Sequence, residues 1–184
     1  QSYKNGIALI KSGGKWGMID RQGGTLLDPE FSNIKFIENT DNQLLRIFAD
    51  KEQYGVIDSL GRVVADIVYQ DVMPCTQERI GAKRGGKWGF VDTQGRLVTP
   101  FKYEKVQPFS EGLAAVRHGR KWGYINLNGD LVIEHNFRKV GNFNGSLAPA
   151  RKEGSKLGYI NKKGEKVIPH TFHECSDFED AMAR

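Results

Sequence analysis

The chain has 184 residues, of which 39% are hydrophobic and 27% are charged, and its formal net charge is +5. This composition is typical of a folded globular or repeat protein and excludes a disordered chain. No apolar run of about 18 residues is present, so no membrane span is expected, and no basic block of the kind found in nucleic-acid-binding arms occurs.

One short pattern recurs five times along the chain, at intervals of 38, 34, 34 and 35 residues. It is centred on an anchor residue followed directly by glycine, and the anchors are Trp16, Tyr54, Trp88, Trp122 and Leu157. A second glycine stands seven residues after each anchor, an aromatic residue fifteen after, and a mostly apolar residue eighteen and twenty-one after. These registers in step predict a repeat protein in which each copy is one supersecondary unit.

The elements within a copy are clearest in the fourth one. The apolar run at 112–117 and the segment at 121–126 are expected to be strands, with Trp122 and Tyr124 on one face of the second. At 126–129, Asn in first place and Gly in fourth predict a type I turn capped by the Asn side chain, before a third strand. Each copy is therefore predicted to be a three-stranded antiparallel meander. Its last residues, apolar at every third position, predict a compact turn or a short fourth strand.

The anchors are expected to join neighbouring copies, because a sheet of three short strands cannot bury both of its faces by itself. We expect the anchor side chain to be the main contact, and the glycine beside it to admit the backbone or ring of the next copy. The alternative is that exposed tryptophans bind sugars or bases. Leu157, which is a poor stacking platform, favours the structural role.

The sequence thus predicts an all-β repeat protein, organised as a single array over residues 1–184. The units span about 1–37, 38–75, 76–109, 110–143 and 144–178, and 179–184 match the first strand of a sixth copy. Because a closed five-bladed ring would not duplicate that strand, we expect an open, β-solenoid-like stack; a β-propeller is the alternative. The uncovered face of an open stack, and a start at Gln1 rather than at methionine, predict further repeats or domains of the same chain.

Residues able to carry chemistry do not converge in the sequence. Cys75 and Cys175 occupy apolar positions of the repeat and are expected to be buried. His170, His173, Glu174 and Cys175 are close together, but a non-helical segment does not place them on one face as metal ligands. No phosphate-binding loop or nucleophile elbow occurs. We therefore expect no metal, no cofactor and no catalysis.

Basic residues repeat beside four of the anchors, five or six positions before the anchor and again directly before it. The set is Lys11, Lys15, Lys83, Lys87, Arg117, Lys121, Arg151 and Lys156. Stacked copies would align them into basic columns. Such columns predict either a surface for an acidic partner, which would be a protein, a polysaccharide or a lipid headgroup, or a solvated strand edge that lysine protects from mispairing. No basic and aromatic face typical of a nucleic-acid reader is present.

The segments "KWGMID", "KWGFVD" and "KWGYIN", each followed by a turn glycine and by stretches such as "TPFKYEKVQPFSEGLAAV", resemble the bacterial WG-repeat (KWG-repeat) family over essentially the whole chain. "QYGVID" and "KLGYIN" are degenerate copies without the tryptophan. The resemblance implies an all-β repeat protein without shared catalytic residues. It also implies that the protein is often attached to other modules or exported, to the periplasm or cell surface rather than kept in the cytoplasm. A non-catalytic interaction or scaffold module that binds a protein or a cell-surface polymer is therefore the leading interpretation, and a carbohydrate-binding, lectin-like module is the alternative.

Overall fold

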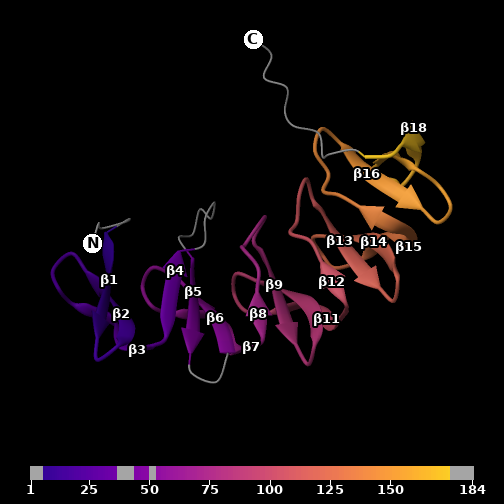
Figure 1. Ribbon diagram of the computed structural model, residues 1–184. Helices are drawn as coiled ribbons and strands as arrows, with labels where there is room; N and C mark the ends of the chain where they lie inside the picture. Colours follow the sequence, from indigo (N-terminus) through magenta and orange to yellow (C-terminus); the bar gives the residue numbers. More distant parts are fainter. Residues whose placement is uncertain (1–5, 37–43, 50–52, 175–184) are drawn as a thin grey trace, which may run out of the picture. The chain divides into compact units, whose positions relative to one another are not determined.

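The computed structural model describes residues 6–36, 44–49 and 53–174, and within these ranges it contains eighteen strands and no helix (Figure 1). The predicted all-β class is thus confirmed. The chain divides into two compact units, 1–86 with 91–97 and 87–90 with 98–184. The described residues hold no helix long and apolar enough to cross a membrane.

The first unit contains two complete sheets. The first has the order β1-β2-β3, with β1 (Ile7–Ser12), β2 (Lys15–Asp20) and β3 (Thr25–Phe31). The second has the order β4-β5-β6-β7, with β4 (Asn33–Phe36), β5 (Leu45–Ala49), β6 (Gln53–Ile57) and β7 (Val63–Tyr69).

The strands that follow form two further sheets. One has the order β11-β10-β9-β8, with β8 (Asp71–Val72), β9 (Arg79–Arg84), β10 (Lys87–Asp92) and β11 (Leu97–Tyr103). The other runs in chain order from β12 to β18 and lies in the second unit. Its strands are β12 (Lys105–Val106), β13 (Leu113–His118), β14 (Lys121–Asn126), β15 (Leu131–Val140), β16 (Leu147–Lys152), β17 (Leu157–Asn161) and β18 (Lys166–Phe172).

The predicted meander is present in every copy, and the tail of a copy is a strand that joins the sheet of the next copy. The short strand β4 pairs with β5 from Asn33↔Phe48 to Phe36↔Leu45. In the fourth copy the tail is fused to the third strand, so that β15 pairs with β14 by its first part and with β16 by its last. Each later copy therefore receives an additional strand from the preceding copy. This strand is the short fourth strand that was one of the two predictions for the last residues of a copy.

The turns between second and third strands form as the sequence predicts. In the third copy, Asp92 Oδ1 accepts hydrogen bonds from the backbone N–H groups of Gln94 and Arg96, both at 2.9 Å. Burial of the carboxyl opposes its ionisation, but these bonds and the Arg96 side chain lower the pKa of Asp92 below its usual value. The fourth residue, Gly95, has φ +78°, which an L side chain rarely adopts.

The same turn glycine is also a contact between copies. A methyl group at Gly95 would lie 2.5 Å from the carbonyl oxygen of Val64, and one at Gly129 would lie 2.7 Å from that of Val98. Gly61 approaches the carbonyl oxygen of Leu26 in the same way, whereas Gly164 approaches the side chain of Ile133. The turn of each copy after the first is therefore seated on the third strand of its predecessor, and glycine is required there for space as well as for conformation.

The tryptophans lie at the margin of the core rather than at its centre. Trp122 and Trp16 are partly buried against core clusters that also contain residues of the following copy. That the anchors are the main contact between copies stays a prediction. Trp16, Trp88 and Trp122 are half-buried, and of the five anchors only Leu157 is buried. The centre is formed by the residue two positions later, which is at most 1% exposed in the first four copies. These residues are Met18, Val56, Phe90 and Tyr124.

Two ring contacts hold the centre together in the second unit. Phe90 packs edge to face on Phe109, and Tyr124 packs likewise on Phe143, each with centroids 4.9 Å apart. The Tyr124 hydroxyl donates to the carbonyl oxygen of Gly141 at 2.8 Å, so the buried phenol is satisfied. The predicted apolar positions eighteen and twenty-one residues after the anchor are buried wherever they are described; Ile37, Cys175 and Phe178 lie outside the described residues.

The glycine beside the anchor has a different role from the predicted one. Between the pairs Trp122↔Phe137 and Tyr124↔Ile133, one residue of β14 opposes three of β15, so β15 bulges over Gly123. A side chain there would collide with the Ile133 carbonyl oxygen and with the backbone of the two following residues. The glycine therefore makes room for a bulge of its own sheet, not for the next copy.

Cys75 is 5% exposed, as predicted for an apolar position of the repeat. Burial raises the pKa of its thiol to about 11. Such a thiol is almost wholly protonated at neutral pH and is a weak nucleophile.

Candidate functional site

Two of the predicted basic residues lie over the anchor rings. Lys11 pairs with Trp16 across the first hairpin, and its Nζ is 5.5 Å from the ring centroid. Arg117 pairs with Trp122 in the same way, with its guanidinium carbon at 5.9 Å. Both distances fall in the range of cation–π attraction. Lys11 is exposed, whereas Arg117 is half-buried and its Nε is buried without a hydrogen-bond partner within the protein.

In the second copy a residue that the sequence did not single out takes this role. Arg46 lies 4.3 Å from the centroid of Tyr54, and its Nη1 donates to the Val72 carbonyl oxygen at 3.2 Å and lies 3.6 Å from a carboxylate oxygen of Asp71. The position equivalent to Lys11 is Ala49. Because Arg46 comes from another position of β5, a search at fixed spacing does not find it.

Lys87 takes part in a polar contact between two copies. Its Nζ lies 2.6 Å from Glu104 Oε1, and the other oxygen of that carboxylate accepts from the Gly119 N–H at 2.9 Å. The hydrogen bond from Lys87, followed by that from Gly119, keeps the pKa of Glu104 below its usual value against the effect of burial. Lys87 is therefore engaged within the protein, and its role in binding stays a prediction.

The other predicted basic residues are spread over the hairpins. Lys15 and Lys83 are half-buried, and Lys121, Arg151 and Lys156 are exposed. Lys83 pairs with Asp71 in the β8–β9 ladder. The alignment of these residues into columns stays a prediction.

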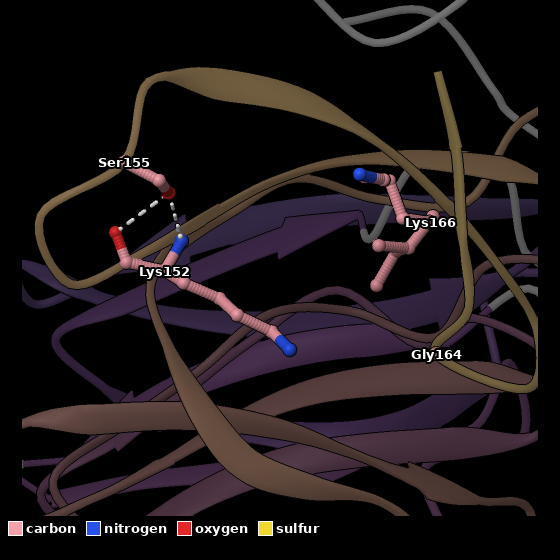
Figure 2. A pocket seen from close by; sticks show the side chains of 5 residues that line it. Lys152, Ser155, Gly164 and Lys166 are labelled. Atoms are coloured by element: carbon pink, nitrogen blue, oxygen red, sulfur yellow. Dashed lines mark hydrogen bonds between the residues drawn. The ribbon is translucent and has the colours of Figure 1, made fainter. Parts of the chain in front are cut away.

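The second unit contains a cavity of about 340 Å³ in the last copy. It is lined by Lys152, Ser155, Ile160, Gly164 and Lys166. Figure 2 shows Lys152 on the side of the β16–β17 hairpin and Lys166 on the side of β18. The lining thus combines two lysines with the apolar side chain of Ile160, a composition that suits a small anionic group.

The chain fixes both sides of this cavity locally. The Ser155 hydroxyl accepts from the Lys152 N–H at 3.1 Å and donates to the Lys152 carbonyl oxygen at 3.0 Å, which closes the hairpin (Figure 2). Lys152 pairs with Phe137 across the β15–β16 ladder, and its Nζ is 5.7 Å from that ring. Sequence reasoning missed both lysines. Lys152 stands five residues before Leu157, as Lys11 and Arg117 stand before their anchors, but the neighbouring Arg151 was chosen for that role. Lys166 stands at no basic position shared with other copies.

A pair of imidazole rings lies on the bulge of β15. His135 is half-buried, its ring centroid is 5.8 Å from that of His118, and its Nε2 has no hydrogen-bond partner within the protein. Burial, and then the neighbouring His118, lower the pKa of His135. The described residues hold no group of three His, Cys, Asp or Glu side chains that fits a metal. Cys175 and the side chain of His170 lie outside the description.

The repeat register of the structure coincides with that of a known family. The family model described as "WG containing repeat" matches residues 16–40, 54–88, 88–122, 122–155 and 158–184. The chain belongs to the WG-repeat family. The first four matches begin at the anchors and the fifth begins one residue after Leu157. No curated protein sequence matches this WG-repeat chain.

Solved structures with low sequence identity resemble the fold of the WG-repeat chain. A structure described as the eukaryotic initiation factor matches with a TM-score of 0.54 and 13% identity, over 87% of this chain and 50% of that one. Hsv2 of Kluyveromyces lactis gives 0.47 and 13%, over 89% and 59%, and BamB of Moraxella catarrhalis gives 0.43 and 10%, over 90% and 61%. The chain thus spans between half and about three fifths of these structures. The choice between an open stack and a propeller stays a prediction.

Proposed function

We propose that this chain is a non-catalytic interaction module that holds an acidic partner, either a protein or a cell-surface polymer, on basic residues next to its hairpins. The observation that carries the proposal is the cavity where Lys152 and Lys166 flank Ile160. Two ammonium groups beside an apolar wall suit a carboxylate carried on a hydrocarbon stem, as in an acidic side chain or an acidic sugar.

The cations held over rings support the same proposal. Lys11 over Trp16 and Arg117 over Trp122 are confined by the ring beneath them, so they lose less conformational entropy when a ligand binds. An array of such positions lets an extended partner engage several repeats, each contributing modestly. The net charge of +5 favours the approach of an acidic partner.

Titration with poly-glutamate as the probe tests this function. We expect binding that weakens steeply with salt, and a loss of affinity of about thirtyfold in the double variant Lys152→Ala and Lys166→Ala, because each of the two lost charge contacts contributes about 1 kcal/mol. The matched control is Lys139→Ala with Lys163→Ala, which removes the same charge from two exposed lysines outside the cavity. Equal loss in both double variants would contradict a role for the cavity.

A carbohydrate-binding role is a second candidate, because the three tryptophans are half-exposed. Against it, Lys11 and Arg117 already lie over two of these rings, where a sugar would stack. Titration with neutral oligosaccharides, followed by tryptophan fluorescence, separates the candidates. Saturable quenching that is insensitive to salt would favour the lectin-like role over the acidic partner.

A further inference from the structure

We propose that His118 and His135 bind one divalent transition-metal ion, such as Zn²⁺, between their imidazole rings in the fourth copy. The two histidines are 17 residues apart in the sequence and come together only in the fold, so the site departs from the sequence-based expectation of no metal. It is separate from the cavity of the last copy and independent of the acidic partner proposed above. Ring geometry, an unsatisfied nitrogen atom and the surrounding charges carry the proposal.

The two rings lie at a distance that a shared metal ion can bridge. His118 ends β13, His135 lies on the bulge of β15, and their ring centroids are 5.8 Å apart with an angle of 59° between the ring planes. A Zn–N bond is about 2.1 Å long, so two imidazoles on one ion have centroids roughly 4.5–6 Å apart. The backbone therefore already brings both ligands together, and rotation of the side chains suffices to direct one nitrogen of each ring at the ion.

The Nε2 atom of His135 supplies the second observation. It is buried and has no hydrogen-bond partner within the protein, although most buried polar atoms are paired. Burial, and then His118, lower the pKa of His135, so its imidazole is neutral at pH 7 and keeps a lone pair that a metal can accept. Because His118 is exposed, the ion can enter from solvent on the side of this ring and keep water in its remaining positions.

The charged groups around the pair do not exclude a cation. Those that act on His135 are two carboxylates and one ammonium group, namely Glu134, Glu104 and Lys102. Lys87 neutralises part of the charge of Glu104. Lys121 lies opposite His118 in the ladder, but it is exposed and can extend its ammonium group into water. The field at the pair is thus close to neutral, and the affinity comes from the bonds between metal and imidazole.

Tyr103 forms a wall of the site and not a third ligand. It belongs to the preceding copy, is 2% exposed, and has its ring centroid 6.3 Å from that of His135. Burial raises the pKa of its hydroxyl, so the phenol stays protonated. The described residues hold no group of three side chains suited to a metal. The protein therefore supplies two ligands, and the ion keeps open positions for water or a further ligand.

Calorimetric titration of the chain with ZnCl₂, near neutral pH in a buffer that does not bind metal, tests the site. We expect one Zn²⁺ per chain. His118→Ala should lose at least about tenfold in affinity, because even a residue that only supports a ligand contributes this much. The matched control is His173→Ala, which removes an exposed histidine outside the pair and should bind like the wild type. Circular dichroism verifies folding, and His135→Gln provides a second variant that should show the same loss.

Nitrogen NMR of the histidine rings identifies the ligands directly. Zn²⁺ should shift the ring resonances of His118 and His135 together, at equal metal concentration, and leave those of His173 unchanged. Wild-type chain that shows no saturable binding would overturn the proposal. So would shifts confined to one ring of the pair, or an affinity that is kept in His118→Ala and lost in His173→Ala, since the ion would then be bound elsewhere.

Discussion

Two aromatic residues on the same face of β14 lie only two positions apart but differ in burial and in their contacts. Tyr124 is 1% exposed, packs on Phe143 and donates its hydroxyl to Gly141, whereas Trp122 is half-buried with Arg117 over its ring. The residue that marks the family in sequence thus lies at the rim. The residue that fills the core varies between copies, from Val56 to Phe90, because apolar side chains of different size can be accommodated there.

The largest expected effect is at Tyr124. Replacement of Tyr124 by alanine should lower the free energy of unfolding by about 3–5 kcal/mol, because it opens a cavity against Phe143 and leaves the Gly141 carbonyl oxygen without its hydrogen-bond donor. Urea denaturation followed by circular dichroism measures the change. Tyr124→Phe keeps the ring and should lose about 1 kcal/mol, the net value of the hydrogen bond.

Trp122→Leu sharpens the comparison, because leucine already occupies the anchor position at Leu157, where it is buried. We expect this variant to lose less than about 1.5 kcal/mol. If Trp122→Leu destabilises the protein as much as Tyr124→Ala, the rim and the middle are not energetically distinct.

Gly123 lies between these two residues, and the addition of a single methyl group there should already destabilise the protein. Gly123→Ala pushes a methyl group into the backbone of the β15 bulge and should cost about 1–3 kcal/mol. The control is Gly119→Ala in the preceding hairpin turn, where nothing lies within 4 Å and only the positive φ of +62° opposes alanine. This control should lose about 1 kcal/mol. A smaller loss at Gly123 than at Gly119 would contradict the bulge as the reason for the glycine.

The repeat register and the turns were predictable because their signals are local. Asp92 and Gly95 stand within one turn, and the chemistry of each residue type acts on its own backbone. The apolar positions that pair across copies were also found, because the same spacing recurs in every copy. A repeated sequence in effect reports each structural requirement several times.

The rest depends on contacts that spacing does not encode. The bulge over Gly123 is set by how many β15 residues oppose β14, which the strand pattern alone leaves open. Gln77 and Glu78 form a two-residue turn with φ of 49° and 59°, a conformation these residue types do not favour. The cavity lined by Lys152 and Lys166 arises where two segments of the last copy face each other. The repeat register marks Lys152 as a basic position, but nothing in the sequence links it to Lys166.

A smaller loss of folding stability is expected at low pH from the protonation of His135. Burial, and then His118, lower its pKa, so the folded state disfavours the proton that the unfolded chain accepts near pH 6.5. The corresponding stability is complete above that pH and is lost as pH falls through the lower, folded pKa. The other charged groups acting on it are Lys102, Glu134 and Glu104.

The variant His135→Gln should therefore flatten the fall of unfolding free energy on the acid side of about pH 6.5. Its contribution is at most one proton, or about 1.4 kcal/mol per pH unit. Thermal unfolding over a pH series measures it, with the exposed His173→Gln as the control. If His135→Gln leaves the pH dependence of stability unchanged, the imidazole of His135 binds its proton equally well in the folded and the unfolded state.

The smallest expected effect is at the ion pair of Lys87 and Glu104, which joins two hairpins at their exposed ends. Lys87→Met should lower the free energy of unfolding by less than about 1 kcal/mol, because the side chains are 44% and 27% exposed and water screens the charges. The hydrogen bond from Lys87 lowers the pKa of Glu104, so its stabilisation is complete above the unfolded value of about 4.3 and is lost as pH falls through the folded pKa. Lys87→Met should weaken this acid dependence but leave part of it, since the Gly119 N–H still donates to the carboxylate. A loss as large as that of Tyr124→Ala would mean that the rim, and not the buried ring, carries the contact between these copies.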